Sequence, residues 1–112
     1  MLTLDRAMAF DAAAADAFLN TLPPRPAVVL IEPRTELAGA RPLLLRTADL
    51  RRRMRLLLGP RDPDPATKRV HLASYAGGIR FRLTGSAFEQ SLAHYQNARA
   101  LWPREYRKRM RM

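Results

Sequence analysis

The fold of this chain depends on residues 22–59, which read LPPRPAVVLIEPRTELAGARPLLLRTADLRRRMRLLLG. Residues 27–31 and 42–45 are short apolar runs bounded by turn residues, a pattern typical of buried strands. The residues between the two runs include Gly39 and suit the connection of a hairpin. This stretch therefore predicts two strands joined by a hairpin.

A basic helix is expected after the second strand. Thr47 is a candidate N-cap, and the carboxylate of Asp49 lies in the first turn, where it suits the helix dipole. Gly59 and the proline after it end the helix. The apolar positions are spaced as one helix face and comprise Leu50, Met54, Leu57 and Leu58. The basic positions are Arg51, Arg52, Arg53 and Arg55. Arg53 lies about 60° from Leu50, at the edge of the apolar stripe, from which its guanidinium can reach a cleft beside the sheet.

A third strand is predicted at residues 79–83. Ile79, Phe81 and Leu83 alternate with Arg80 and Arg82, so one face of this strand would be buried and the other would be basic.

A last helix follows the third strand. Ser86 and Glu89 form a capping box, and Pro103 ends the helix after about Trp102. The apolar stripe expected to face the core comprises Phe88, Leu92, Tyr95 and Trp102.

The whole chain, residues 1–112, is expected to be one domain, as its length suggests. Residues 1–21 suit a brace on the core, with a short strand at residues 2–4 and a helix over residues 12–20 that Asp11 caps. Residues 104–112 form a basic tail. Together the elements predict an α/β (α+β) fold, in which helices flank a small three-stranded, mainly antiparallel sheet.

The composition restricts the function. The chain has no cysteine, which excludes disulfides, thiol nucleophiles and cysteine metal sites. No apolar run reaches membrane-spanning length and no signal-peptide pattern opens the chain, so a cytoplasmic location is expected. The net charge is +10, and arginine makes up most of the basic residues. This charge favours a polyanionic partner, and arginine favours bidentate contacts with phosphate.

The same residues resemble a known family, the GIY-YIG nuclease domain in the form found in UvrC-type bacterial excision-repair subunits. The resemblance lies in the Leu22-Pro23 lead, the strand that opens at Pro26, the helix that opens Asp49-Leu50 and reaches Arg53, and the last helix before Pro103. It covers residues 22–103. The resemblance implies a GIY-YIG-like fold and hydrolysis of a phosphodiester. In the family, two strand tyrosines flank the attacking water, a helix arginine stabilises the phosphate, and a glutamate on the later helix holds one divalent metal.

The catalytic pattern of this family is largely unmatched here. Its two tyrosines fall on Val29 and Leu43, which can neither accept a proton nor orient water. Its arginine falls on Arg53, and the lysine after its second strand motif falls on Arg46. Its glutamate falls on His94, which we interpret as a surface residue; a neutral histidine is also a poor ligand for magnesium. Glu89 is the nearest alternative carboxylate, although it already belongs to the capping box.

The sequence therefore predicts a catalytically depleted GIY-YIG-like domain that binds the backbone of nucleic acid, with DNA favoured. The predicted contacts are Arg46, Arg51, Arg52, Arg53, Arg80 and Arg82, with a second patch of Arg107, Lys108, Arg109 and Arg111. No cofactor is expected. One alternative is a divergent endonuclease that uses magnesium or manganese with Arg53 and either His94 or Glu89. Another is a protein-interaction module for an acidic partner. A nuclease-like site would require Arg46, Arg53, Arg80 and His94 to converge on one cleft.

Overall fold

The computed structural model describes residues 4–37, 39–59 and 75–103 and has an α+β architecture. Its elements in chain order are β1 (Arg6–Ala9), the 3-10 helix η1 (Ala12–Ala14), α1 (Ala15–Asn20), β2 (Ala27–Pro33), β3 (Leu43–Thr47), α2 (Leu50–Leu58), β4 (Ala76–Leu83) and α3 (Ala87–Leu101). The predicted α/β class, with an antiparallel sheet flanked by helices, is confirmed. The predicted tail at residues 104–112 lies outside the described residues.

The sheet has four strands in the order β1-β4-β2-β3, and every neighbouring pair is antiparallel. The three predicted strands are present as β2, β3 and β4. The fourth strand, β1, lies a few residues later in the chain than the short strand expected at residues 2–4. It pairs with β4, so that Met8 lies opposite Ile79.

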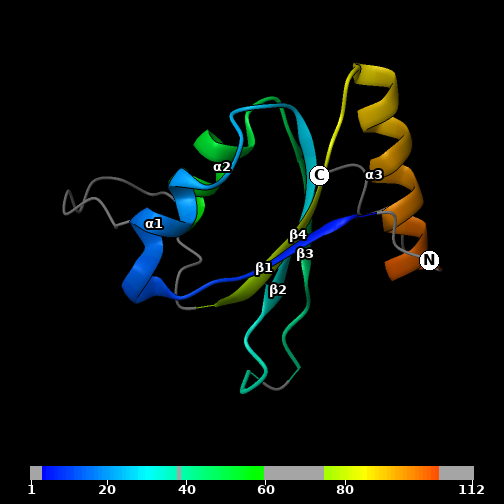
Figure 1. The fold of residues 1–112 in the computed structure, drawn as a ribbon. Coiled ribbons are helices and arrows are strands. Elements are labelled where there is room, and N and C mark those ends of the chain that lie inside the picture. Colours follow the sequence, from blue (N-terminus) through cyan, green and yellow to red (C-terminus); the bar gives the residue numbers. More distant parts are fainter. Residues whose placement is uncertain (1–3, 38, 60–74, 104–112) are drawn as a thin grey trace, which may run out of the picture.

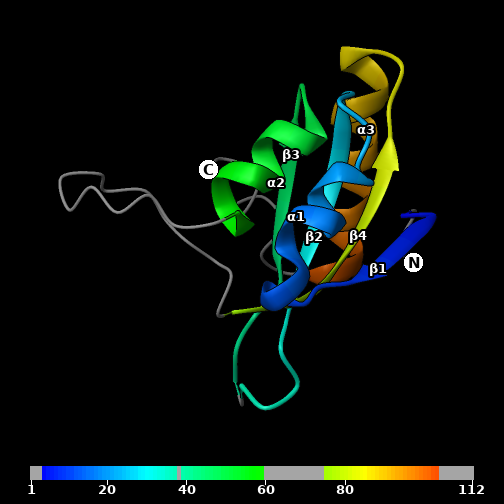
Figure 2. The same ribbon diagram turned by 60° about the vertical axis from the view of Figure 1, so that its left-hand side comes forward.

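Helices cover both faces of the sheet (Figures 1 and 2). On one face, Val29 and Ile31 of β2 pack with Leu50 and Met54 of α2 and with residues of α1. On the other face, Val28 and Leu30 pack with α3. This double cover explains why β2 is a continuous apolar run, because both of its faces are buried.

Helix α2 forms as the sequence predicts, except at its cap. Asp49, rather than Thr47, is the N-cap, and its carboxylate accepts a hydrogen bond from the Arg52 amide at 3.0 Å. Leu50, Met54 and Leu58 are buried, and Leu57 packs against the same cluster. The predicted apolar face of this helix is therefore confirmed.

Helix α3 turns an unexpected face to the sheet. Its buried residues are Ala93, His94, Asn97 and Ala98. Phe88 is 78% exposed and Leu92 is 44% exposed, so the prediction that they face the core is wrong. Tyr95 is half-buried, while Trp102, just after the helix, does pack against the core. The two buried alanines explain the rotation, because small side chains let the helix backbone approach β2 and β3 closely.

Candidate functional site

The arginines predicted to form one surface lie on two opposite sides of the sheet. Arg51, Arg52 and Arg53 belong to α2, which packs on the Val29 face. Arg80 and Arg82 alternate with Ile79 and Phe81 on β4 and lie on the α3 face, where their strand partners are Leu30 and Val28. Arg46 lies on that same face, opposite Val28 on β3.

The single cleft that a nuclease-like site requires is therefore not formed. His94 and Arg46 lie near each other on the α3 side, whereas Arg53 belongs to the helix layer across the sheet. The positions on which the family tyrosines fall, Val29 and Leu43, both pack in the α1–α2 layer. The structure thus separates the position of the family arginine from the position of the family glutamate.

Two arginines of α2 fasten it to the end of α1 and to the residues just after it. The Arg51 Nε donates to the carbonyl oxygen of Leu22 at 2.7 Å, and its Nη2 donates to the carbonyl oxygen of Asn20 at 3.3 Å. The Arg55 Nη2 donates to the side-chain oxygen of Asn20 at 3.2 Å. Two of the four guanidinium groups of this helix therefore form hydrogen bonds within the protein.

The side chains of Arg52 and Arg53 differ from these two. Both are exposed, and neither forms a hydrogen bond or ion pair with a residue in the described part of the chain. Leu56, which is also exposed, follows one turn later on the same side of the helix. This outer surface of α2 is defined here as the α2 basic face, with Arg52 and Arg53 as its charged groups.

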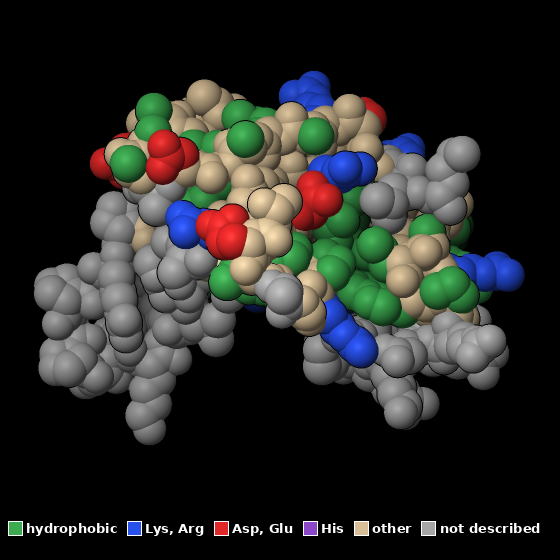
Figure 3. Space-filling view, turned by 90° about the horizontal axis from the view of Figure 1, so that it is seen from below, with side chains coloured by type: hydrophobic (Ala, Val, Ile, Leu, Met, Phe, Trp, Pro, Cys, Tyr) green, Lys and Arg blue, Asp and Glu red, His purple; other side chains and the backbone are tan. Residues whose placement is uncertain are grey.

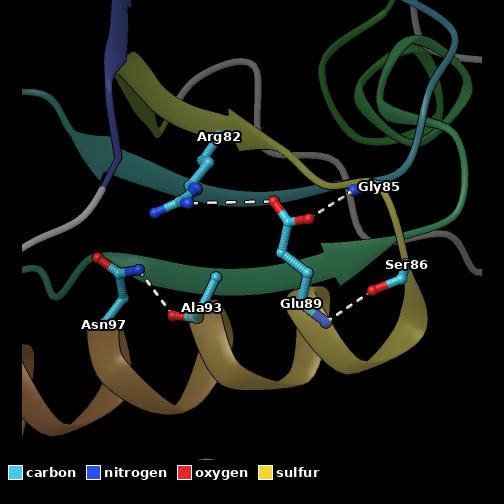
Figure 4. A network of polar contacts seen from close by, with 6 residues as sticks. All are labelled: Arg82, Gly85, Ser86, Glu89, Ala93 and Asn97. Carbon is cyan, nitrogen blue, oxygen red and sulfur yellow. Dashed lines mark hydrogen bonds and ion pairs between the residues drawn. The ribbon is translucent and has the colours of Figure 1, made fainter.

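The predicted contact arginines on the α3 side are engaged. Arg82 Nη2 lies 4.0 Å from Oε1 of Glu89, and the Arg80 Nε donates to Oε1 of Glu32 at 3.0 Å. Arg46 Nη1 donates to the hydroxyl of Ser91 at 3.3 Å. Figure 4 shows Arg82 reaching from β4 to Glu89 in the first turn of α3. The Arg82 and Arg46 contacts attach α3 to the sheet, the Arg80 contact joins β4 to β2, and the two ion pairs leave less net charge for a ligand.

Glu89 acts as a structural residue. Its backbone amide donates to the Ser86 hydroxyl at 3.1 Å, as the predicted capping box requires, and its Oε2 accepts from the Gly85 amide at 3.1 Å (Figure 4). In the described part of the chain, no three His, Cys, Asp or Glu side chains gather as a metal site would need.

His94 is buried, which corrects the prediction that it is a surface residue. It is 5% exposed, and its Nδ1 has no hydrogen-bond partner among the described residues. Burial lowers the pKa of His94, and the positive charge of Arg46 lowers it further. The cause of the error is the rotation of α3, which brings its polar face against the sheet.

Gln90 is a contact residue that sequence reasoning missed. Its side-chain amide reaches the backbone of both β2 and β3 from α3. The one sequence signal for this residue is that it directly follows the capping box of Ser86 and Glu89, which places it in the first turns of the helix.

An open groove of about 560 Å³ lies between β1 and the start of the β2–β3 connection. Its charged lining is mixed, since Arg80 pairs with Glu32 and Arg34 lies 3.9 Å from Glu36. Figure 3, a view of the molecule from below, shows the same mixture of acidic and basic side chains. A groove with balanced charges is a poor match for a polyanion.

Two further observations concern the chain as a whole. Arg107, Lys108, Arg109 and Arg111, the predicted second patch, lie outside the described residues. Of the helices that the structure describes, none is long and apolar enough to cross a membrane.

Comparison with protein-family models, with curated proteins and with solved structures finds no match to this chain.

Proposed function

We propose that this chain binds the phosphate backbone of nucleic acid, with DNA as the first candidate, through the α2 basic face. One observation carries the proposal: Arg52 and Arg53 are adjacent, exposed and unengaged by the described residues. Exposed arginines that hold no internal partner are available for bidentate contacts with phosphate.

The charge around these two residues supports the proposal. Helix α2 has four arginines and no acidic residue between Leu50 and Leu58. The carboxylate of Asp49, which precedes it, already accepts the Arg52 amide. The field at this surface is therefore positive, and the chain as a whole adds a net charge of +10.

The attachment of α2 also supports it. Arg51 and Arg55 hold the helix against α1, and Leu50 and Met54 hold it against the sheet. The two free guanidiniums therefore project from a fixed base, which reduces the ordering that binding would require. Backbone contacts of this kind position a protein on nucleic acid without reading its sequence.

In this proposal the chain is a catalytically depleted GIY-YIG-like domain. The order of a β2–β3 hairpin, α2, β4 and α3 agrees with the order that the resemblance implies. Val29 and Leu43 offer no hydroxyl at the positions where the family has tyrosines, and His94 is buried on the far side of the sheet from α2. Binding without cleavage is the expected behaviour.

A salt titration of binding tests the proposal. The double variant Arg52→Gln/Arg53→Gln removes two charges from the α2 basic face, and Arg80→Gln/Arg82→Gln removes two charges from the other side of the sheet. The first variant is expected to weaken binding to duplex DNA of every sequence and to reduce the log–log salt slope by about 0.9 for each phosphate that is no longer neutralised. The second is expected to have a much smaller effect, because its arginines are ion-paired.

The outcomes separate the candidate functions. Equal weakening in the two variants would mean that nucleic acid is attracted by the overall positive charge and not by the α2 basic face. If no binding is measured at low salt, nucleic acid is excluded as the ligand. A parallel assay in magnesium and in manganese measures cleavage. Cleavage that disappears in an Arg53→Ala variant would establish an endonuclease instead.

A further inference from the structure

We propose that the outward side of α3 docks an acidic, amphipathic helical segment of another protein. The docking stripe is defined as Phe88, Leu92 and Tyr95, which are spaced at i, i+4 and i+7 along the helix. This spacing is how a helix presents anchor residues to a partner. The stripe lies across the sheet from the α2 basic face, so the two surfaces can be occupied together.

The exposure of the stripe is the first argument. Phe88 is 78% exposed and Leu92 is 44% exposed, although α3 buries His94 and Asn97 against the sheet. A helix whose only task was to cover the sheet would gain by turning Phe88 and Leu92 inward, because burial of apolar surface is favourable and burial of polar groups is costly. Neighbouring exposed apolar side chains on one line are typical of an interaction surface.

The charges around the stripe are the second argument. Arg99 lies one turn beyond Tyr95 on the same line and is exposed. Arg46 reaches one flank of the stripe, where it donates to Ser91. Glu89, the acidic residue of α3, is on the other flank and faces Arg82. The surface is thus apolar along the stripe and positive at its Arg99 end and on its Arg46 flank, which complements a segment with an apolar line and acidic residues beside it.

Other occupants fit less well. A second copy would pair the surface that carries Arg46 and Arg99 with an identical surface, and each chain already carries a net charge of +10. The chain's own residues 104–112 have five basic residues against one acidic residue, so their charge does not complement Arg46 and Arg99. A bilayer requires a helix with a strong contrast between its faces, and the contrast in α3 is weak. Bases of a single strand would stack on aromatic rings, but the aliphatic Leu92 lies between Phe88 and Tyr95.

Fluorescence anisotropy with a synthetic peptide tests this docking surface. The probe is a labelled helical peptide with leucines at i, i+4 and i+7 and glutamates on both flanks, and its control carries lysines in place of the glutamates. The full chain is expected to bind the acidic probe saturably and the lysine probe much more weakly. Phe88→Gln/Leu92→Gln is expected to weaken binding by at least about tenfold, because buried apolar anchors dominate such contacts. Arg46→Gln/Arg99→Gln is expected to lower the affinity for the acidic probe and also to make that affinity less dependent on salt concentration.

A matched control is Leu37→Gln, which changes an exposed leucine far from α3 in the sequence and is expected to leave binding unchanged. Circular dichroism of each variant confirms that it is folded. Three results would overturn the proposal: no saturable binding of the acidic probe, equal binding by Phe88→Gln/Leu92→Gln, or equal binding of the lysine probe. The proposal would also be overturned if the wild-type chain forms a dimer, or binds a single-stranded oligonucleotide or an anionic vesicle, and Phe88→Gln/Leu92→Gln abolishes that complex. Each of these results would identify a different occupant of the docking stripe.

Discussion

Gln90 and Thr47 are joined by a short hydrogen bond, in which the Gln90 Nε2 donates to the carbonyl oxygen of Thr47 at 2.7 Å. The same Nε2 lies 3.3 Å from the carbonyl oxygen of Ala27, the residue that pairs with Thr47 between β2 and β3. One side chain of α3 therefore closes the end of the two-strand ladder and fixes the position of the helix along it.

The variant Gln90→Ala is expected to lower the free energy of unfolding by about 1–3 kcal/mol, because it leaves two part-buried carbonyl groups without this donor. Urea denaturation measures the decrease. Gln96→Ala, at an exposed position of the same helix, is the control and should change stability by less than about 0.5 kcal/mol. Equal effects of the two variants would show that the Gln90 contact contributes nothing specific.

The buried His94 predicts a pH dependence of stability. Its pKa is lowered in the folded chain, so the unfolded chain takes up a proton first as the pH falls below about 6.5. Stability is therefore complete above that pH and decreases as the pH falls toward the lowered pKa of the folded state. Urea denaturation at several pH values should show this decrease in the wild type. A His94→Leu variant should lose this component, while His71→Gln should keep it.

The rotation of α3 predicts that Phe88 can be replaced by a polar residue with little change in the free energy of unfolding. The change Phe88→Gln is expected to alter the free energy of unfolding by less than about 0.5 kcal/mol, as for other exposed positions. Leu50→Ala, at a fully buried position of α2, is expected to cost about 2–5 kcal/mol. A large decrease in stability with Phe88→Gln would mean that this ring faces the core after all.

Gly78 predicts a sensitive point between β1 and β4. A Cβ atom at this position would lie 2.9 Å from the carbonyl oxygen of Met8, so Gly78→Ala must displace the backbone of β1. We expect stability to fall by about 1–3 kcal/mol and amide exchange in β1 to become faster. At Gly85 an added Cβ would meet only the Glu89 side chain, at 3.4 Å, so Gly85→Ala should leave β1 protected.

Local patterns in the sequence predicted the elements well where charge and apolarity contrast strongly. Helix α2 is the clearest case, because Leu50, Met54 and Leu58 lie on the side that packs on the core, whereas its arginines lie on other sides of the helix. Helix α3 shows the limit of this reasoning. Its N-cap, Ser86, was predicted correctly, but its rotation depends on how Ala93 and Ala98 fit against Val28, Leu30 and Leu44, which lie far away in the chain.

The same limit applies to the candidate site. The sequence shows which residues are arginines, but it does not show which of them are neutralised. Arg80 pairs with Glu32, which is 48 residues away in the chain, and this pairing depends on the antiparallel register of β2 and β4. Arg51 likewise looks free in the sequence, although it holds the carbonyl oxygen of Leu22. Among the predicted contacts that the structure describes, Arg52 and Arg53 are left available, and they could be identified only after these contacts were known.

The strand order has a consequence for how the chain folds. The β2–β3 hairpin closes a short loop, so it can form early, whereas the pairing of β2 with β4 must bring together segments separated by α2 and residues 59–75. Among the described strands, β1 has only β4 as a neighbour, so it can dock only after β4 is in place. A ribosome releases β1 first and β4 last of the four strands. The first strand to emerge is therefore the last to find its partner, and the nascent chain must keep it from pairing elsewhere until Leu83 has been made.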